Sequence, residues 1–90
     1  MKTAAVWKWE LPLQDVATIQ VPKGTEFLHV HDQHQSLCIW GLCDPAEDQQ
    51  EERTFRVAGT GHPLANGKFK YIGSAHSRGG HLVFHVFECL

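Results

Sequence analysis

The stretch His81-Leu82-Val83-Phe84-His85-Val86-Phe87-Glu88, in the last part of the chain, decides the fold. Its apolar residues occupy both alternating faces, with positions 82, 84 and 86 on one side and positions 83 and 87 on the other. This pattern predicts a strand that is buried on both faces. Such a strand in a short chain predicts a small, tightly packed β domain.

Six further segments have the alternation or the apolar content of strands, and turn signals separate them. The clearest breaks are Pro22-Lys23-Gly24, Asp44-Pro45 and Asn66-Gly67, all of which favour turns. The predicted segments are residues 7–11, 18–21, 26–32, 36–43, 53–58 and 69–72. No segment has the 3.6-residue period of a helix. We therefore predict an all-β fold, an antiparallel β-sandwich or a small β-barrel of about seven strands.

Length and composition predict one domain over residues 1–90. The chain has 90 residues, of which 42% are hydrophobic and 20% are charged. A chain of this size buries only about 60% of the surface that it exposes when unfolded, so its core is thin. Burial between subunits adds stability to such a domain, and this favours a homo-oligomer.

The cysteines and the hydropathy pattern predict a reduced, cytosolic protein. Cys38, Cys43 and Cys89 are an odd number of thiols without C-x-x-C spacing. The chain does not open with a secretory signal pattern. No segment approaches the roughly 20 apolar residues of a membrane helix, so no membrane partner is expected. We interpret the thiols as small buried hydrophobic residues.

The charge distribution favours a small anionic ligand over a long nucleic acid. The net charge is −2, but five of the ten acidic residues lie between positions 44 and 52. The rest of the chain holds eight Lys and Arg against five acidic residues, without a basic stripe. Binding along a duplex normally requires such a stripe, so no long nucleic acid is expected as a partner.

The loop Gly59-Thr60-Gly61-His62-Pro63 is the first candidate for an anion site. Consecutive backbone N–H groups in a glycine-rich turn can converge on an anion, and the Thr60 hydroxyl and the His62 imidazole add donors. Arg56 precedes the loop on the face of its strand opposite the core, and Arg78 lies in a later turn that could reach the same ligand. Trp40 or Tyr71 could contact a base. A plain strand connection and core aromatic residues are the alternatives.

His29 and His31 form a second candidate, because side chains two apart in a strand share a face and could bind one metal ion. This resembles the metal motif of the cupin β-barrels. Gln35 stands where that family has a glutamate ligand, and Gly24 is one residue too close to the histidines. His62 or His85 could supply a third ligand. The alternative is a pair of exposed histidines.

Six ordered blocks of the sequence together resemble a family of small phage and prophage proteins, the domain of unknown function DUF7352. The blocks are WELP at 9–12, VPKG at 21–24, RTFRV at 53–57, GTGHP at 59–63, YIGS at 71–74 and LVFHVFE at 82–88. The resemblance covers essentially the whole chain and does not depend on His29 or His31. It implies an accessory protein of viral origin, in the host bacterial cytoplasm, without a known reaction. Such proteins are similar in kind to phage proteins that sequester nucleotide signals of bacterial immunity.

These observations favour a binding protein over an enzyme. The expected ligand is a small anionic, nucleotide-derived molecule, and its expected contacts are Arg56, Thr60, Gly61, His62, Arg78 and the aromatic residue Trp40 or Tyr71. Neither a catalytic residue nor a cofactor is needed for this function. The alternatives are a cupin-like enzyme with a metal at His29 and His31, and a structural module that binds a protein through exposed strand edges.

Overall fold

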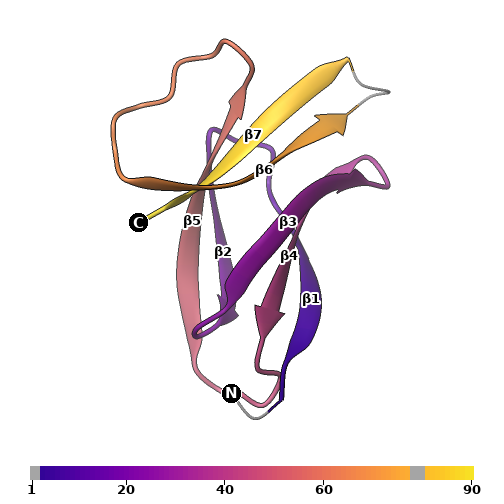
Figure 1. Cartoon of the computed structure of the whole chain (residues 1–90), viewed down its shortest axis with the longest axis vertical. Helices are drawn as coiled ribbons and strands as arrows, with labels where there is room; N and C mark the ends of the chain where they lie inside the picture. Colours follow the sequence, from indigo (N-terminus) through magenta and orange to yellow (C-terminus); the bar gives the residue numbers. More distant parts are fainter. Residues whose placement is uncertain (1–2, 78–80) are drawn as a thin grey trace.

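A computed structural model describes residues 3–77 and 81–90, and these residues form seven strands and no helix (Figure 1). The strands are β1 (Ala5–Glu10), β2 (Val16–Pro22), β3 (Glu26–Gln33), β4 (Ser36–Cys43), β5 (Gln50–Gly59), β6 (Phe69–Ser77) and β7 (Leu82–Cys89). The prediction of an all-β fold is confirmed. Since the described residues include no helix, they include none with the length and hydropathy needed to cross a bilayer.

The strands form two antiparallel sheets with the orders β1-β4-β3 and β2-β5-β7-β6. Between the two predicted alternatives the structure is a sandwich, because no hydrogen-bonded ladder of the described residues joins one sheet to the other. The sheets approach most closely where β3 lies against β6. A Cβ atom on Gly73 of β6 would lie 3.0 Å from Cγ2 of Val30 on β3, so the glycine permits this approach.

The core lies between the sheets and contains the inward residues of both. Phe55, Ile39, Val21, Val30 and Val86 are among its largest fully buried side chains. The rings of Phe27 and Phe55 meet edge to face across the sandwich, with their centroids 4.9 Å apart. The alternation of polar and apolar residues from Thr54 to Val57 in β5 places Phe55 inward, as the sequence predicts.

Strand β7 is central in its sheet, but the prediction that both of its faces are buried is wrong. Val86 and Glu88 on its inner face are buried, whereas Val83, His85 and Phe87 on its outer face are only half-buried. The neighbouring strands β5 and β6 cover the two edges of β7, and no further layer of the described chain covers its outer face. The apolar residues there are therefore available for contacts.

The predicted alternation of β3 is wrong at one point, because this strand contains a β-bulge. The sequence places Leu28 and Val30 on one face and Phe27 on the other. In the structure Phe27 pairs with Gly41 and His29 with Trp40, so Leu28 is the extra residue. Phe27 and Val30 consequently both face the core, while Leu28 is 46% exposed and Val30 only 1%.

The bulge predicts that truncating two similar side chains changes the free energy of unfolding by very different amounts. We expect Val30→Ala to lower the free energy of unfolding by about 2 kcal/mol, because it leaves a cavity in the core. Leu28→Ala should change it by less than about 0.5 kcal/mol, because its side chain faces solvent. Urea unfolding of both variants measures the difference. A larger loss for Leu28→Ala than for Val30→Ala would contradict the bulge.

Candidate functional site

A cavity of about 260 Å³ lies beside the end of β5, where strand β2 stops pairing with it. The last pair of that ladder is Val16 with Arg56, and beyond it the Val57 N–H donates to the Asp15 carbonyl. The cavity is lined by Asp15, Arg56, Val57, Ala58, His62, Pro63 and Leu64. The structure thus joins Arg56 and His62, two of the predicted ligand contacts, in one cavity.

The Arg56 guanidinium is incompletely satisfied. Its Nε atom is buried and has no hydrogen-bond partner within the described part of the chain. A buried donor without a partner costs about 1–3 kcal/mol. Asp15 lines the same cavity, but the two ion pairs found among the described residues both belong to Arg53. The cavity wall therefore combines a guanidinium that lacks a partner for Nε, an imidazole and one carboxylate.

The loop after β5 begins with a tight turn that fixes His62. The His62 N–H donates to the Gly59 carbonyl over 3.0 Å, and Gly61 at the third position has φ +84°, as a type II turn requires. A Cβ on Gly59 would lie 2.8 Å from Nδ1 of His62, so the imidazole packs against the bare glycine backbone. Because this turn uses the His62 N–H, the loop has one backbone donor fewer for an anion than the sequence suggests.

A chain of hydrogen bonds connects this loop with β7 and β6. Thr60 Oγ1 lies 2.6 Å from His85 Nε2, His85 Nδ1 lies 2.7 Å from Ser74 Oγ, and Ser74 Oγ lies 2.6 Å from Tyr71 Oη. Both imidazole nitrogens are thus occupied by hydroxyl groups. The predicted contacts Thr60 and Tyr71 lie at the two ends of the chain. Ser74 was not predicted as a site residue, and His85 was suggested only as a third metal ligand.

The outer face of the four-stranded sheet carries aromatic side chains beside Arg56. Phe87 of β7 pairs directly with Arg56 of β5 and with Tyr71 of β6, and directly paired residues share a face. The Tyr71 and Phe87 ring centroids are 5.3 Å apart, and those of Phe69 and Phe87 are 6.1 Å apart. Arg56, Phe87 and Tyr71 therefore follow one another across three strands.

Trp40 is not part of this arrangement. It lies on β4 of the three-stranded sheet, paired with Lys8 and His29, and its ring centroid is 5.8 Å from that of His29. Since β4 belongs to the other sheet, Trp40 does not share a face with Tyr71. Arg78, the remaining predicted contact, lies outside the described residues.

The histidines of the cupin-like motif lie on the three-stranded sheet. His29 and His31 are both exposed, and their rings stack with centroids 5.9 Å apart. His62 and His85, the suggested third ligands, lie at β5 and β7 of the other sheet. Residues 3–77 and 81–90 contain no group of three or more His, Cys, Asp or Glu side chains that could hold a metal ion.

A second charged cluster is structural and lies between the sheets. Arg53 of β5 forms an ion pair with the buried Glu88 of β7 and donates to the Thr25 carbonyl and to Glu51, both at 2.9 Å. The hydrogen bond to Glu88 raises the pKa of Arg53. The Gly24 N–H donates to Glu51, and this contact, more than Arg53, lowers the pKa of the Glu51 carboxyl. The cluster ties the β2–β3 turn to the four-stranded sheet.

The three cysteines are free, and two of them are buried as predicted. Burial raises the pKa of the Cys38 thiol and that of the Cys43 thiol. A raised pKa keeps a thiol protonated at neutral pH, and the thiolate is the reactive form. These two residues therefore act as core side chains.

Comparison with known proteins assigns the chain to a family. No curated protein and no solved structure matches the chain. Residues 2–89 match the family described as "Domain of unknown function (DUF7352)". Because this match spans nearly the whole chain, the protein belongs to the DUF7352 family.

Proposed function

We propose that this protein binds a small anionic, nucleotide-derived molecule and catalyses no reaction on it. The observation that carries the proposal is the gathering of Arg56, Thr60, His62 and Tyr71 around the end of β5 and the adjacent outer face. These residues come from two segments of the chain, the end of β5 with the loop that follows it and strand β6. Together they supply positive charge, hydroxyl groups and an aromatic surface.

Each group has a natural role toward a nucleotide. A phosphate accepts charge-assisted hydrogen bonds from Arg56, and these are roughly twice as strong as neutral ones. The rings of Tyr71 and Phe87 offer a surface on which a base stacks, worth about 1–3 kcal/mol per base in single-strand binding proteins. Asp15 in the same cavity repels a second phosphate and accepts a hydrogen bond from a ribose hydroxyl or an amino group. This favours a ligand with phosphate at one end and donors at the other.

The proposal extends to the biological setting. The resemblance noted in the sequence supports an accessory protein of phage or prophage origin, which acts in the host bacterial cytoplasm by sequestering a nucleotide signal of bacterial immunity. A homo-oligomer suits this role, because the exposed apolar residue Val16 pairs with Arg56 and so adjoins the ligand contacts. A second copy packed there would enclose the ligand and strengthen its contacts.

A ligand screen by native mass spectrometry tests the proposed function. The purified protein is mixed in turn with cyclic dinucleotides, ADP-ribose derivatives and the corresponding nucleosides without phosphate. We expect at least one phosphate-bearing compound to bind below about 1 mM, and the nucleosides to bind at least about tenfold more weakly. Failure of every phosphate-bearing compound to bind would remove the proposal.

A further inference from the structure

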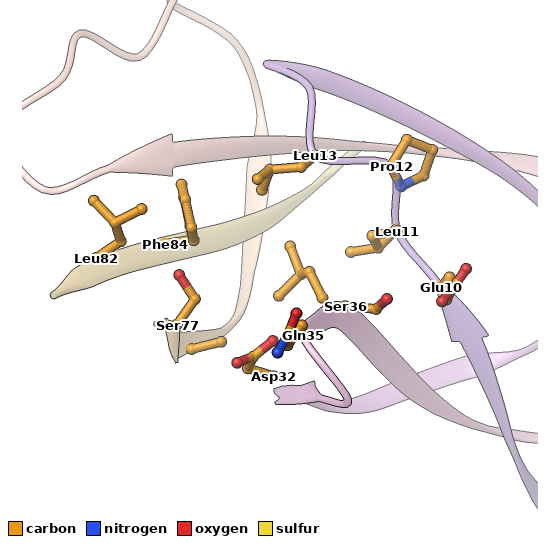
Figure 2. Close-up of a pocket in the computed structure, with 12 residues that line it drawn as sticks. Glu10, Leu11, Pro12, Leu13, Asp32, Gln35, Ser36, Ser77, Leu82 and Phe84 are labelled. Atoms are coloured by element: carbon orange, nitrogen blue, oxygen red, sulfur yellow. The ribbon is translucent and has the colours of Figure 1, made fainter. Parts of the chain in front are cut away.

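A second and larger cavity, of about 620 Å³, lies at one end of the sandwich. It is enclosed by the segment between β1 and β2, the β3–β4 turn and the adjoining ends of β6 and β7 (Figure 2). Its volume lies within the roughly 300–1,000 Å³ typical of small-molecule sites. It shares no lining residue with the cavity beside Arg56, so the two are separate features.

The inner wall of this cavity is apolar. Leu11, Leu37 and Ala75 come from three different segments, are themselves core residues and line the cavity together with Phe84. Leu13 and Leu82 also line it and remain exposed (Figure 2). An apolar group that fills this space is stabilised in proportion to the apolar surface that is removed from water.

Among the described residues that line the cavity, the charged side chains are carboxylates. Asp32 pairs directly with Leu37, so its side chain points to the same inner face, whereas Glu10 at the end of β1 pairs with Cys38 and faces the other way. None of the described residues that line the cavity is a lysine or an arginine. Carboxylates above apolar walls attract a cation and repel an anion. The cavity therefore suits a ligand of the opposite charge to the one proposed for Arg56.

The rim of the cavity contains a turn in an unfavourable conformation. His34 and Gln35 have φ 52° and 68°, and a two-residue hairpin loop of this kind normally carries Asn-Gly. Each such non-glycine residue is less stable than a glycine in this conformation, and strain of this kind concentrates at ligand sites. Gln35 lines the cavity, so the turn keeps a side-chain amide at the rim at the expense of stability.

We propose that this cavity binds a small amphiphilic cation, a molecule with an apolar body and one ammonium group. The apolar body occupies the space between Leu11, Leu37, Ala75 and Phe84. The ammonium group forms an ion pair with Asp32, and the Gln35 side-chain amide oxygen lies at the same rim as a further acceptor.

Three probes of equal chain length and different charge test the assignment by calorimetry. They are octylamine, octanol and octanoate, titrated separately into the intact protein. We expect octylamine to bind at least about tenfold more tightly than octanoate, with octanol between them, because the carboxylates attract one head group and repel the other. Equal affinity for octylamine and octanoate, or no heat of binding with any of the three, would overturn the proposal.

Matched variants locate the head group. Asp32→Asn should abolish the preference for octylamine over octanol and leave the octanol affinity unchanged. Asp48→Asn, which removes a charge from the exposed segment between β4 and β5, should leave both affinities unchanged. If circular dichroism shows that Asp32→Asn does not fold, Asp32→Ser replaces it, with the same expected loss of the preference for octylamine. If a folded variant keeps its preference for octylamine over octanol, the proposal is contradicted. It is also contradicted if the chain self-associates and octylamine reverses this association, since a second copy of the chain would then occupy the cavity.

Discussion

Replacing Arg53 with methionine is expected to lower the free energy of unfolding by about 3–5 kcal/mol. Methionine keeps an apolar stem near Phe27, over whose ring the guanidinium lies at 4.9 Å from the centroid. It removes the partner of Glu88, which is only 5% exposed, and the donor to the Thr25 carbonyl. A buried carboxylate without a partner is the main cause of the expected loss. Guanidinium unfolding followed by tryptophan fluorescence measures it.

The double variant Arg53→Met/Glu88→Leu separates the buried charge from packing. An apolar pair in place of a buried ion pair is often neutral or stabilising, so the double variant should recover most of the stability that Arg53→Met loses. Lys23→Met, which removes a cation from the exposed β2–β3 turn, serves as the control and should change stability by less than about 0.5 kcal/mol. A loss below about 1 kcal/mol for Arg53→Met would contradict the structural role of the cluster.

Truncation of Phe55 to alanine should lower the free energy of unfolding by about 3–5 kcal/mol, since it creates a cavity that the core cannot fill. Phe55 is fully buried and contacts Phe27 of the opposite sheet edge to face. Phe69→Ala makes the same change on the outer face, where the ring is half-buried against Phe87, and should cost only about 1 kcal/mol. Thermal or urea unfolding compares the two. Similar losses for both variants would contradict the position of the core.

The sequence predicts a strand most accurately where its residues form a nearly continuous apolar run or a clear alternation. Strand β4 was predicted with its observed limits, and Phe55 and Val57 of β5 face the core as expected. Strand β6 was predicted only to Ile72 because its later inward residues, Gly73 and Ala75, are too small to produce an apolar period. The bulge at Leu28 was missed because an extra residue in one strand is defined by its partner strand, which the sequence does not reveal.

The candidate site was predictable only in part for the same reason. Arg56, Thr60 and His62 are close in the sequence, so their proximity follows from one loop. Tyr71 joins them because β7 lies between β5 and β6, and this strand order cannot be read from local patterns. No pattern in the sequence indicates the contact between Ser74 and His85. Alternation in β7 places His85 outward without indicating what it contacts. Trp40 was grouped with Tyr71 on residue type alone, although the fold puts it on the other sheet.

Calorimetric titration of the wild-type protein, Arg56→Met and Lys23→Met with the phosphate-bearing nucleotide found in the screen tests the proposed function most directly. Lys23 lies beyond the far end of β2 from the Val16–Arg56 pair, so the two variants remove equal charge at different places. We predict that Arg56→Met weakens binding about 10- to 100-fold, the effect of losing hydrogen bonds to a charged group, whereas Lys23→Met leaves the affinity unchanged. Equal affinities of the wild type and Arg56→Met, or equal losses in the two variants, would contradict a phosphate site at Arg56.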